Sequence, residues 1–316
     1  MVQKEKYGTG VVVALITPLK SDGRIDQKGL ETIISHCLAG GVHGIFVLGT
    51  TGEGPCFVQN DRSKIIRTAR KFTGEDTPLY VGVMDTSTER VKENIKIAED
   101  NGADILVVTP PYYLSSNTQE EIVRHVELSA RYASVPVMVY NIPRCTHTNI
   151  DLSTVKEIME IDNVIGLKDS SGDWEQFQKE VFLKDKNNSF RILIGAEELF
   201  GVGMLMGADG CVTGIGNYLP ELLVSLCKEA KRGNAEKIKK LQHKVTRLRT
   251  ISLVGDFWLA GLKYTCSVLG LCEEYLSLPF QTLTKFQKLS VRNILKEEGL
   301  LSYEGSQILR SGRYQN

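Results

Sequence analysis

Short apolar runs alternate with longer amphipathic segments along most of the chain. The runs are rich in Val and Ile and are bounded by turn residues, which is the pattern of buried strands. The predicted strands are Gly10–Ile16, Gly44–Leu48, Leu79–Val83, Ile105–Thr109, Val137–Tyr140, Val164–Lys168, Ile192–Ile194 and Gly210–Thr213. Apolar residues at helical spacing between them predict the helices Gln27–Ala39, Asp61–Phe72, Thr88–Asn101, Thr118–Tyr132, Leu152–Ile161, Trp174–Leu183, Glu198–Met206 and Leu219–Lys231.

Strict alternation of strands and helices predicts the fold class. Eight strands that alternate with helices are the count of an α/β (β/α)8 TIM barrel, which we predict over residues 1–232. An open doubly wound sheet is the alternative, but it often carries a GxGxxG turn after an early strand. The nearest glycine pair, Gly201-Val202-Gly203, lies inside a helix-like run.

The alternation stops near residue 232. Helical patterns follow over Asn234–Ile251, Phe257–Leu269 and Thr282–Glu297. We therefore predict a C-terminal helical appendage over residues 233–300 that packs on the barrel, and a polar tail over residues 301–316.

Composition narrows the class of partner. Lys+Arg and Asp+Glu both number 38, so no basic excess points to nucleic acid or to an anionic membrane. No apolar run approaches the ~18 residues of a membrane helix. The seven cysteines are scattered without a CxxC pair, which favours a reduced, cytoplasmic protein. We expect a small-molecule partner.

Two reactive side chains end neighbouring predicted strands. Tyr140 closes one strand, Lys168 closes the next, and a predicted helix connects the two. A strand–helix–strand crossover makes the strands parallel, so both side chains would stand at their carboxyl ends, where α/β folds bind ligands. A buried lysine loses its proton more easily and can attack carbonyls. Alternatively, Lys168 reaches solvent or pairs with Asp169.

Three further strand ends carry candidate chemistry, each with an ordinary alternative. Gly49–Pro55 offers glycines, hydroxyls and free N–H groups for a carboxylate, or is a turn with a capping threonine. The tyrosines of Thr109–Tyr113 relay protons or form an aromatic rim. The acidic residues of Ile194–Glu198 bind substrate hydroxyls or start a helix favourably.

These motifs together resemble a known family. GTTGE at Gly49–Glu53, YNIP at Tyr140–Pro143 and GLKDSSGD around Lys168 look like the dihydrodipicolinate synthase / N-acetylneuraminate lyase family over about residues 7–300. The resemblance implies a (β/α)8 barrel with a C-terminal helical region, a homotetramer, and no metal or organic cofactor. It also implies a class I, Schiff-base pyruvate-dependent aldolase.

The resemblance assigns roles to residues. Lys168 would form a Schiff base with pyruvate or another 2-oxo acid, and Tyr140 would carry protons. Thr50 and Thr51 would hold the carboxylate and orient Tyr140. Three further positions match the family's pocket lining or subunit contact: Gly195, Val212 and Tyr112. Since the stiff loop with Tyr112 can project aromatics outward, we expect a homo-oligomer in which Tyr112 approaches a neighbour.

One departure from the synthase pattern bears on the substrate. The synthases usually have YNxPxRT, whose arginine binds the carboxylate of aspartate semialdehyde, whereas Cys145 stands there in this chain and Arg144 is one residue early. Glu197 and Glu198 resemble the acidic pair with which sialic acid lyases bind sugar hydroxyls, and Ser170 adds a hydroxyl where those lyases have threonine.

The sequence therefore favours an aldolase acting on a 2-keto-3-deoxy sugar acid, a sialic acid-like compound or 4-hydroxy-2-oxoglutarate. A 4-hydroxy-tetrahydrodipicolinate (dihydrodipicolinate) synthase, which condenses pyruvate with aspartate semialdehyde in lysine biosynthesis, is the alternative. A second alternative is a non-catalytic relative that senses pyruvate.

Overall fold

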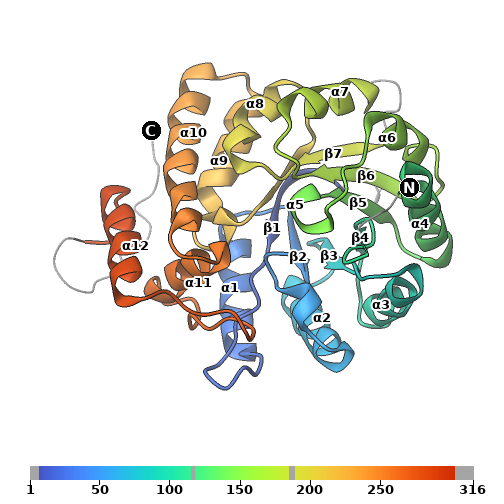
Figure 1. Cartoon of the computed structure of the whole chain (residues 1–316). Helices are drawn as coiled ribbons and strands as arrows, with labels where there is room; N and C mark the ends of the chain where they lie inside the picture. Colours follow the sequence, from blue (N-terminus) through green and yellow to red (C-terminus); the bar gives the residue numbers. More distant parts are fainter. Residues whose placement is uncertain (1–6, 115–117, 185–188, 303–316) are drawn as a thin grey trace.

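A closed ring of parallel strands forms the centre of the computed structural model, which describes residues 7–114, 118–184 and 189–302 (Figure 1). Most of the predicted polar tail, residues 303–316, lies outside the described residues. The strands are β1 (Gly10–Ala14), β2 (Gly44–Val47), β3 (Leu79–Gly82), β4 (Ile105–Val108), β5 (Val137–Asn141), β6 (Val164–Asp169), β7 (Arg191–Ile194) and β8 (Gly210–Thr213). Each pairs in parallel with the next, and β1 pairs with β8. Closure confirms the (β/α)8 barrel and excludes the open sheet.

Helices connect the strands and cover the outside of the barrel (Figure 1). They are α1 (Gln27–Ala39), α2 (Gln59–Thr73), α3 (Thr88–Asp100), α4 (Gln119–Tyr132), α5 (Pro143–Thr146), α6 (Leu152–Ile158), α7 (Trp174–Lys184), α8 (Phe200–Leu205) and α9 (Pro220–Lys231). Single-turn 3-10 helices follow three strands: η2 (Gly54–Cys56), η3 (Glu197–Leu199) and η4 (Ile215–Asn217). The predicted helix Glu198–Met206 was wrong in form, because η3 and α8 divide it. Helix α5 was not predicted.

The core has two layers because successive strand residues face opposite sides. Outward-facing residues of the strands pack against the helices in one large apolar cluster. Inward-facing residues fill the lumen in a second cluster, which includes Phe46, Tyr80, Met138, Tyr140 and Val212. The lumen is therefore a packed core, and ligand chemistry is confined to the strand ends.

Over residues 233–302, which the structure describes, three helices follow the barrel: α10 (Ala235–Arg249), α11 (Trp258–Val268) and α12 (Lys285–Glu297), with the 3-10 helix η5 (Thr250–Leu253) after α10. Helix α10 packs along α9 and contacts η3, and α12 lies at the outer edge (Figure 1). Among the described residues, no helix combines the length and the apolar character needed to cross a bilayer.

Candidate active site

Lys168 and Tyr140 lie side by side at the carboxyl ends of β6 and β5. The two residues are register partners across the strand pair. The Lys168 Nζ atom lies 3.6 Å from the centroid of the Tyr140 ring and 5.1 Å from that of Phe46. Lys168 is only 5 % exposed, so its side chain does not reach solvent. An ammonium over two ring faces is partly stabilised by cation–π attraction.

Burial changes the acid–base behaviour of Lys168. Desolvation lowers the pKa of its ammonium group below the ordinary 10.5, because the charged form loses water. Tyr140 opposes this shift, and the positive charge of Arg144 adds to it. A lower pKa leaves more of the amine neutral near pH 7, and the neutral amine is the form that attacks a carbonyl carbon.

Asp169 does not pair with Lys168. Its side chain lies on the outer side of the strand, where Oδ2 accepts a hydrogen bond of 2.8 Å from Asn141 Nδ2 and Oδ1 accepts one of 2.7 Å from the Ser171 hydroxyl. Asn141 and Asp169 are themselves register partners, one residue beyond Tyr140 and Lys168. The buried hydrogen bond between Asn141 and Asp169 holds the ends of β5 and β6 together. Asp169 is therefore not the ion-pair partner of Lys168.

The loop after β2 places Thr50 and Thr51 at the same end of the barrel. Thr51 is buried and Thr50 is half-buried. Leu48 and Glu53 flank the loop, and both adopt left-handed backbone angles, with φ of 58° and 55°. Such angles cost non-glycine residues about 1–3 kcal/mol each, so the surrounding structure must hold the loop in this conformation. The following 3-10 helix is capped at Glu53, so neither threonine serves as its cap.

The two tyrosines after β4, Tyr112 and Tyr113, lie in different environments. Tyr112 is half-buried and packs against the lumen cluster. Tyr113 is 83 % exposed and has a left-handed φ of 78°. The ring that projects outward is therefore that of Tyr113, and the contact of Tyr112 with a neighbouring subunit stays a prediction. The stiff Pro110-Pro111 pair indicated the loop but could not indicate which of two adjacent rings turns inward.

The acidic pair after β7 is engaged by the protein itself. Glu197 is buried, and its Oε1 accepts hydrogen bonds from the Thr213 hydroxyl (2.5 Å), from Gly214 N (3.0 Å) and from Ile215 N (2.9 Å). Arg249 Nε lies 3.5 Å from Glu197 Oε2 and 3.2 Å from Glu198 Oε1. Both carboxylates thus have a cationic partner.

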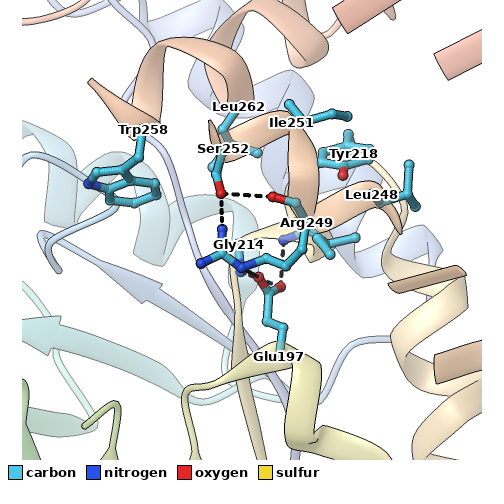
Figure 2. A pocket seen from close by; sticks show the side chains of 10 residues that line it. Glu197, Gly214, Tyr218, Leu248, Arg249, Ile251, Ser252, Trp258 and Leu262 are labelled. Atoms are coloured by element: carbon cyan, nitrogen blue, oxygen red, sulfur yellow. Dashed lines mark hydrogen bonds and ion pairs between the residues drawn. The ribbon is translucent and has the colours of Figure 1, made fainter. Parts of the chain in front are cut away.

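Figure 2 shows Glu197 and Arg249 at a small hollow between the strand ends and the C-terminal helices. Arg249 lies between Glu197 and Ser252, and Trp258 stands across the hollow. Lys168 is not among the residues that line it. Glu197 therefore joins the β7 and β8 strand ends to α10. Its Oε1 atom already accepts three hydrogen bonds from the protein, so this atom is not free to accept hydrogen bonds from substrate hydroxyls. Sequence reasoning missed Arg249, because its partners are distant in the chain.

Arg144 lies in the short helix that follows β5, close to Lys168. It is an exposed residue of α5, and its guanidinium carbon is 5.5 Å from the ring centroid of Trp258. Its charge also contributes to the lowered pKa of Lys168, which places the two cations in the same electrostatic neighbourhood. The adjacent Cys145 is exposed. A weakly hydrated guanidinium stacked on an indole suits recognition of a carboxylate.

The remaining predicted residues lie around the strand ends. A Cβ atom on Gly195 would come within 1.9 Å of the Ser170 hydroxyl, so only glycine fits beside Ser170. Val212 is buried in the lumen cluster with Tyr140. The structure thus brings Lys168, Tyr140 and Val212 together. Among the described residues, no group of three or more His, Cys, Asp or Glu side chains is placed to hold a metal ion.

A barrel with a desolvated lysine beside a tyrosine at its carboxyl end defines a class of enzyme, the lysine-dependent aldolases. The model of the dihydrodipicolinate synthetase family matches residues 8–298, and the chain belongs to this family. It is thus a class I enzyme, a Schiff-base pyruvate-dependent lyase, as GTTGE, YNIP and GLKDSSGD indicated, and not a non-catalytic sensor.

Similar proteins agree with this assignment. The 4-hydroxy-tetrahydrodipicolinate synthase of Thermotoga petrophila is 31 % identical over 92 % of this chain and 99 % of its own. The structure of dihydrodipicolinate synthase from Bacteroides thetaiotaomicron is 35 % identical, with a TM-score of 0.87 over 92 % of this chain and 99 % of that one. The chloride-inhibited dihydrodipicolinate synthase from Acinetobacter baumannii, solved with pyruvate, is 28 % identical, with a TM-score of 0.87 over 93 % of this chain and 100 % of that one.

Proposed function

We propose that this protein is a 4-hydroxy-tetrahydrodipicolinate synthase that condenses pyruvate with aspartate semialdehyde. The similar proteins above bear this name, and the one from Acinetobacter baumannii binds pyruvate. This reading replaces the sugar-acid aldolase that the sequence favoured. The observation that carries it is the distribution of charge at the carboxyl ends of the strands: Arg249 pairs with both Glu197 and Glu198, while the guanidinium of Arg144 acts as a cation near Lys168.

The proposed chemistry begins at Lys168. Its neutral amine attacks the keto carbon of pyruvate and loses water to form an imine, while Thr50 and Thr51 hold the carboxylate. The protonated imine draws electrons from the adjacent methyl group, which loses a proton and becomes a nucleophilic enamine carbon. Tyr140, in contact with Lys168, carries protons to and from the reacting atoms.

The second half of the reaction depends on the acceptor. The enamine carbon attacks the aldehyde carbon of aspartate semialdehyde, and the aldehyde oxygen takes up a proton. The amino group of the acceptor then attacks the imine carbon and displaces Lys168, which closes the ring and regenerates the free enzyme. In this proposal Arg144 binds the acceptor's carboxylate, since Cys145 carries no charge at that position.

Arg144→Ala is expected to raise KM for aspartate semialdehyde by about 10–150-fold, because a charged hydrogen bond contributes roughly 1.5–3 kcal/mol. The coupled assay with purified enzyme measures this change. Trapping of pyruvate by borohydride should persist in the variant, and turnover with a simple aldehyde that lacks a carboxylate should fall much less than turnover with aspartate semialdehyde.

Glu198→Ala is the matched comparison, because Glu198 is also an exposed charged residue at the carboxyl end of a barrel strand, in this case β7. It should leave the synthase reaction unchanged. The reverse pattern, in which Glu198→Ala weakens cleavage of 2-keto-3-deoxygluconate, N-acetylneuraminate or 4-hydroxy-2-oxoglutarate and Arg144→Ala has no effect, would favour the sugar-acid aldolase instead.

We also propose that the protein forms a homo-oligomer through the loop that carries Tyr113. The Tyr113 ring is exposed, and its backbone has a left-handed conformation that is costly for a residue other than glycine. Contact with a partner subunit would stabilise this conformation. Tyr113→Ala should weaken self-association by roughly 30-fold, since an interface tyrosine that acts as a hot spot contributes ~2 kcal/mol. Sedimentation over a range of concentrations measures this shift.

Tyr132→Ala provides the control, because Tyr132 is an exposed tyrosine of α4. It should not change the sedimentation profile. A wild-type protein that sediments as a fully active monomer would disprove the interface.

A further inference from the structure

A buried ion pair joins the substrate loop to the C-terminal helices. Glu53, the last residue of the GTTGE motif, contacts the ammonium of Lys263 in the middle of α11. The side chains are 1 % and 0 % exposed. Charged residues are almost never buried to this extent unless they are paired. The mechanism above uses neither residue.

Both partners are tied to the same connecting segment between α11 and α12. Lys263 Nζ donates a hydrogen bond of 2.8 Å to the carbonyl oxygen of Tyr275, and Glu53 Oε2 accepts one of 2.7 Å from Ser277 N. Residues 53, 263 and 275–277 therefore form one buried polar unit, which joins the loop after β2 to α11 and to the segment that follows α11. Burial lowers the pKa of Lys263, and the Glu53 carboxylate opposes that shift.

The loop that this unit holds is strained and closely packed. Leu48 and Glu53 bracket Gly49–Gly52, and both have left-handed backbone angles. A Cβ atom on Gly54 would meet the Leu48 carbonyl oxygen at 2.0 Å, so the two ends of the loop touch directly. A second hydrogen bond holds the loop from the segment that follows β1: the Thr17 hydroxyl donates to Gly52 O at 2.7 Å.

We propose that the Glu53–Lys263 pair is a positioning device that fixes Thr50 and Thr51 for the carboxylate of the 2-oxo acid. The inference rests on the proposed function, in which these threonines hold pyruvate. An ion pair with directed hydrogen bonds fixes both the position and the orientation of Glu53, which an apolar contact would not. Since Glu53 lies two residues after Thr51, movement of its side chain is passed to the threonines through a very short backbone segment.

The neutral double variant Glu53→Gln/Lys263→Met tests this role. Replacing a buried ion pair with uncharged residues of similar size is often tolerated by the fold, whereas removing one partner leaves an uncompensated charge. A displacement of ~1 Å in a binding group costs on the order of 100-fold. We therefore expect KM for pyruvate to rise by about 10- to 100-fold, while melting temperature and KM for the aldehyde stay near their wild-type values.

Two further variants complete the design. Glu53→Asp keeps the charge and tolerates the left-handed backbone but shortens the side chain, and it should also raise KM for pyruvate. It serves in place of the double variant where the latter does not fold. Glu298→Gln/Arg247→Met removes an ion pair between α10 and the C-cap residue of α12 that does not touch the loop, and it should leave KM for pyruvate unchanged.

The outcomes separate this inference from the proposed function. Folded variants of the Glu53–Lys263 pair with wild-type KM for pyruvate would overturn the positioning role alone, as would an equal effect in the control pair. A wild-type enzyme that borohydride does not trap with pyruvate would overturn both. A wild-type enzyme that condenses pyruvate with another aldehyde but not with aspartate semialdehyde would overturn the synthase assignment and leave the positioning test intact.

Discussion

Lys168→Arg is expected to abolish turnover and to abolish covalent trapping of pyruvate by borohydride. A guanidinium stays protonated at any working pH, so it cannot attack the keto carbon and form an imine. In the wild-type protein the reduced adduct should block tryptic cleavage after Lys168 and yield a peptide that runs from Glu157 to Lys179. Mass spectrometry of the digest measures this peptide directly.

The pH dependence of trapping adds a second measurement of the same residue. Because burial lowers the pKa of Lys168, the rate of imine formation should rise with pH and level off below 10.5. Lys179→Arg, a change at an exposed lysine of α7, should trap pyruvate normally. Trapping that persists in Lys168→Arg, or that labels another peptide, would show that a different amine forms the imine.

Tyr140→Phe is expected to slow turnover by roughly 10²–10⁴-fold, the usual contribution of a general acid–base group. The substitution keeps the ring over Lys168 and removes only the hydroxyl, so packing and the cation–π contact remain. Trapping of pyruvate should therefore still occur. Steady-state kinetics together with the trapping assay separate the loss of proton transfer from a loss of imine formation.

Tyr112→Phe is the matched control, because Tyr112 is another tyrosine that packs against the lumen cluster. It should change turnover much less than Tyr140→Phe. If Tyr140→Phe turns over as fast as the wild type, another group carries the proton, and Tyr112 is the first residue to test.

The strands and most helices of this protein follow from local patterns. An apolar run such as Val137–Tyr140 is buried on both faces, so its composition alone distinguishes it from the amphipathic segments around it. The same reasoning placed Lys168 and Tyr140 at adjoining strand ends, because a right-handed crossover leaves no other arrangement for consecutive parallel strands. The structure confirms that they are register partners.

Local patterns predicted neither the shortest helix nor which of two adjacent tyrosines is exposed. Helix α5 spans only Pro143–Thr146, too short for any periodicity to show. Tyr112 and Tyr113 are identical in side chain and adjacent in sequence, and only the backbone angle at Tyr113 decides which ring points outward. Family resemblance assigned the contact with a neighbouring subunit to Tyr112, whereas the exposed ring is that of Tyr113.

The sequence by itself determined the barrel, the place of its ligand-binding end and the two residues most suited to imine chemistry. Each of these depends on periodicity and chain order. Only the tertiary structure decided that Arg249 forms an ion pair with Glu197, that Arg144 makes a cation–π contact with Trp258, and that Lys263 forms an ion pair with Glu53. These pairs join residues far apart in the chain, and the energy of a charge depends on which groups surround it after folding, which no local pattern records.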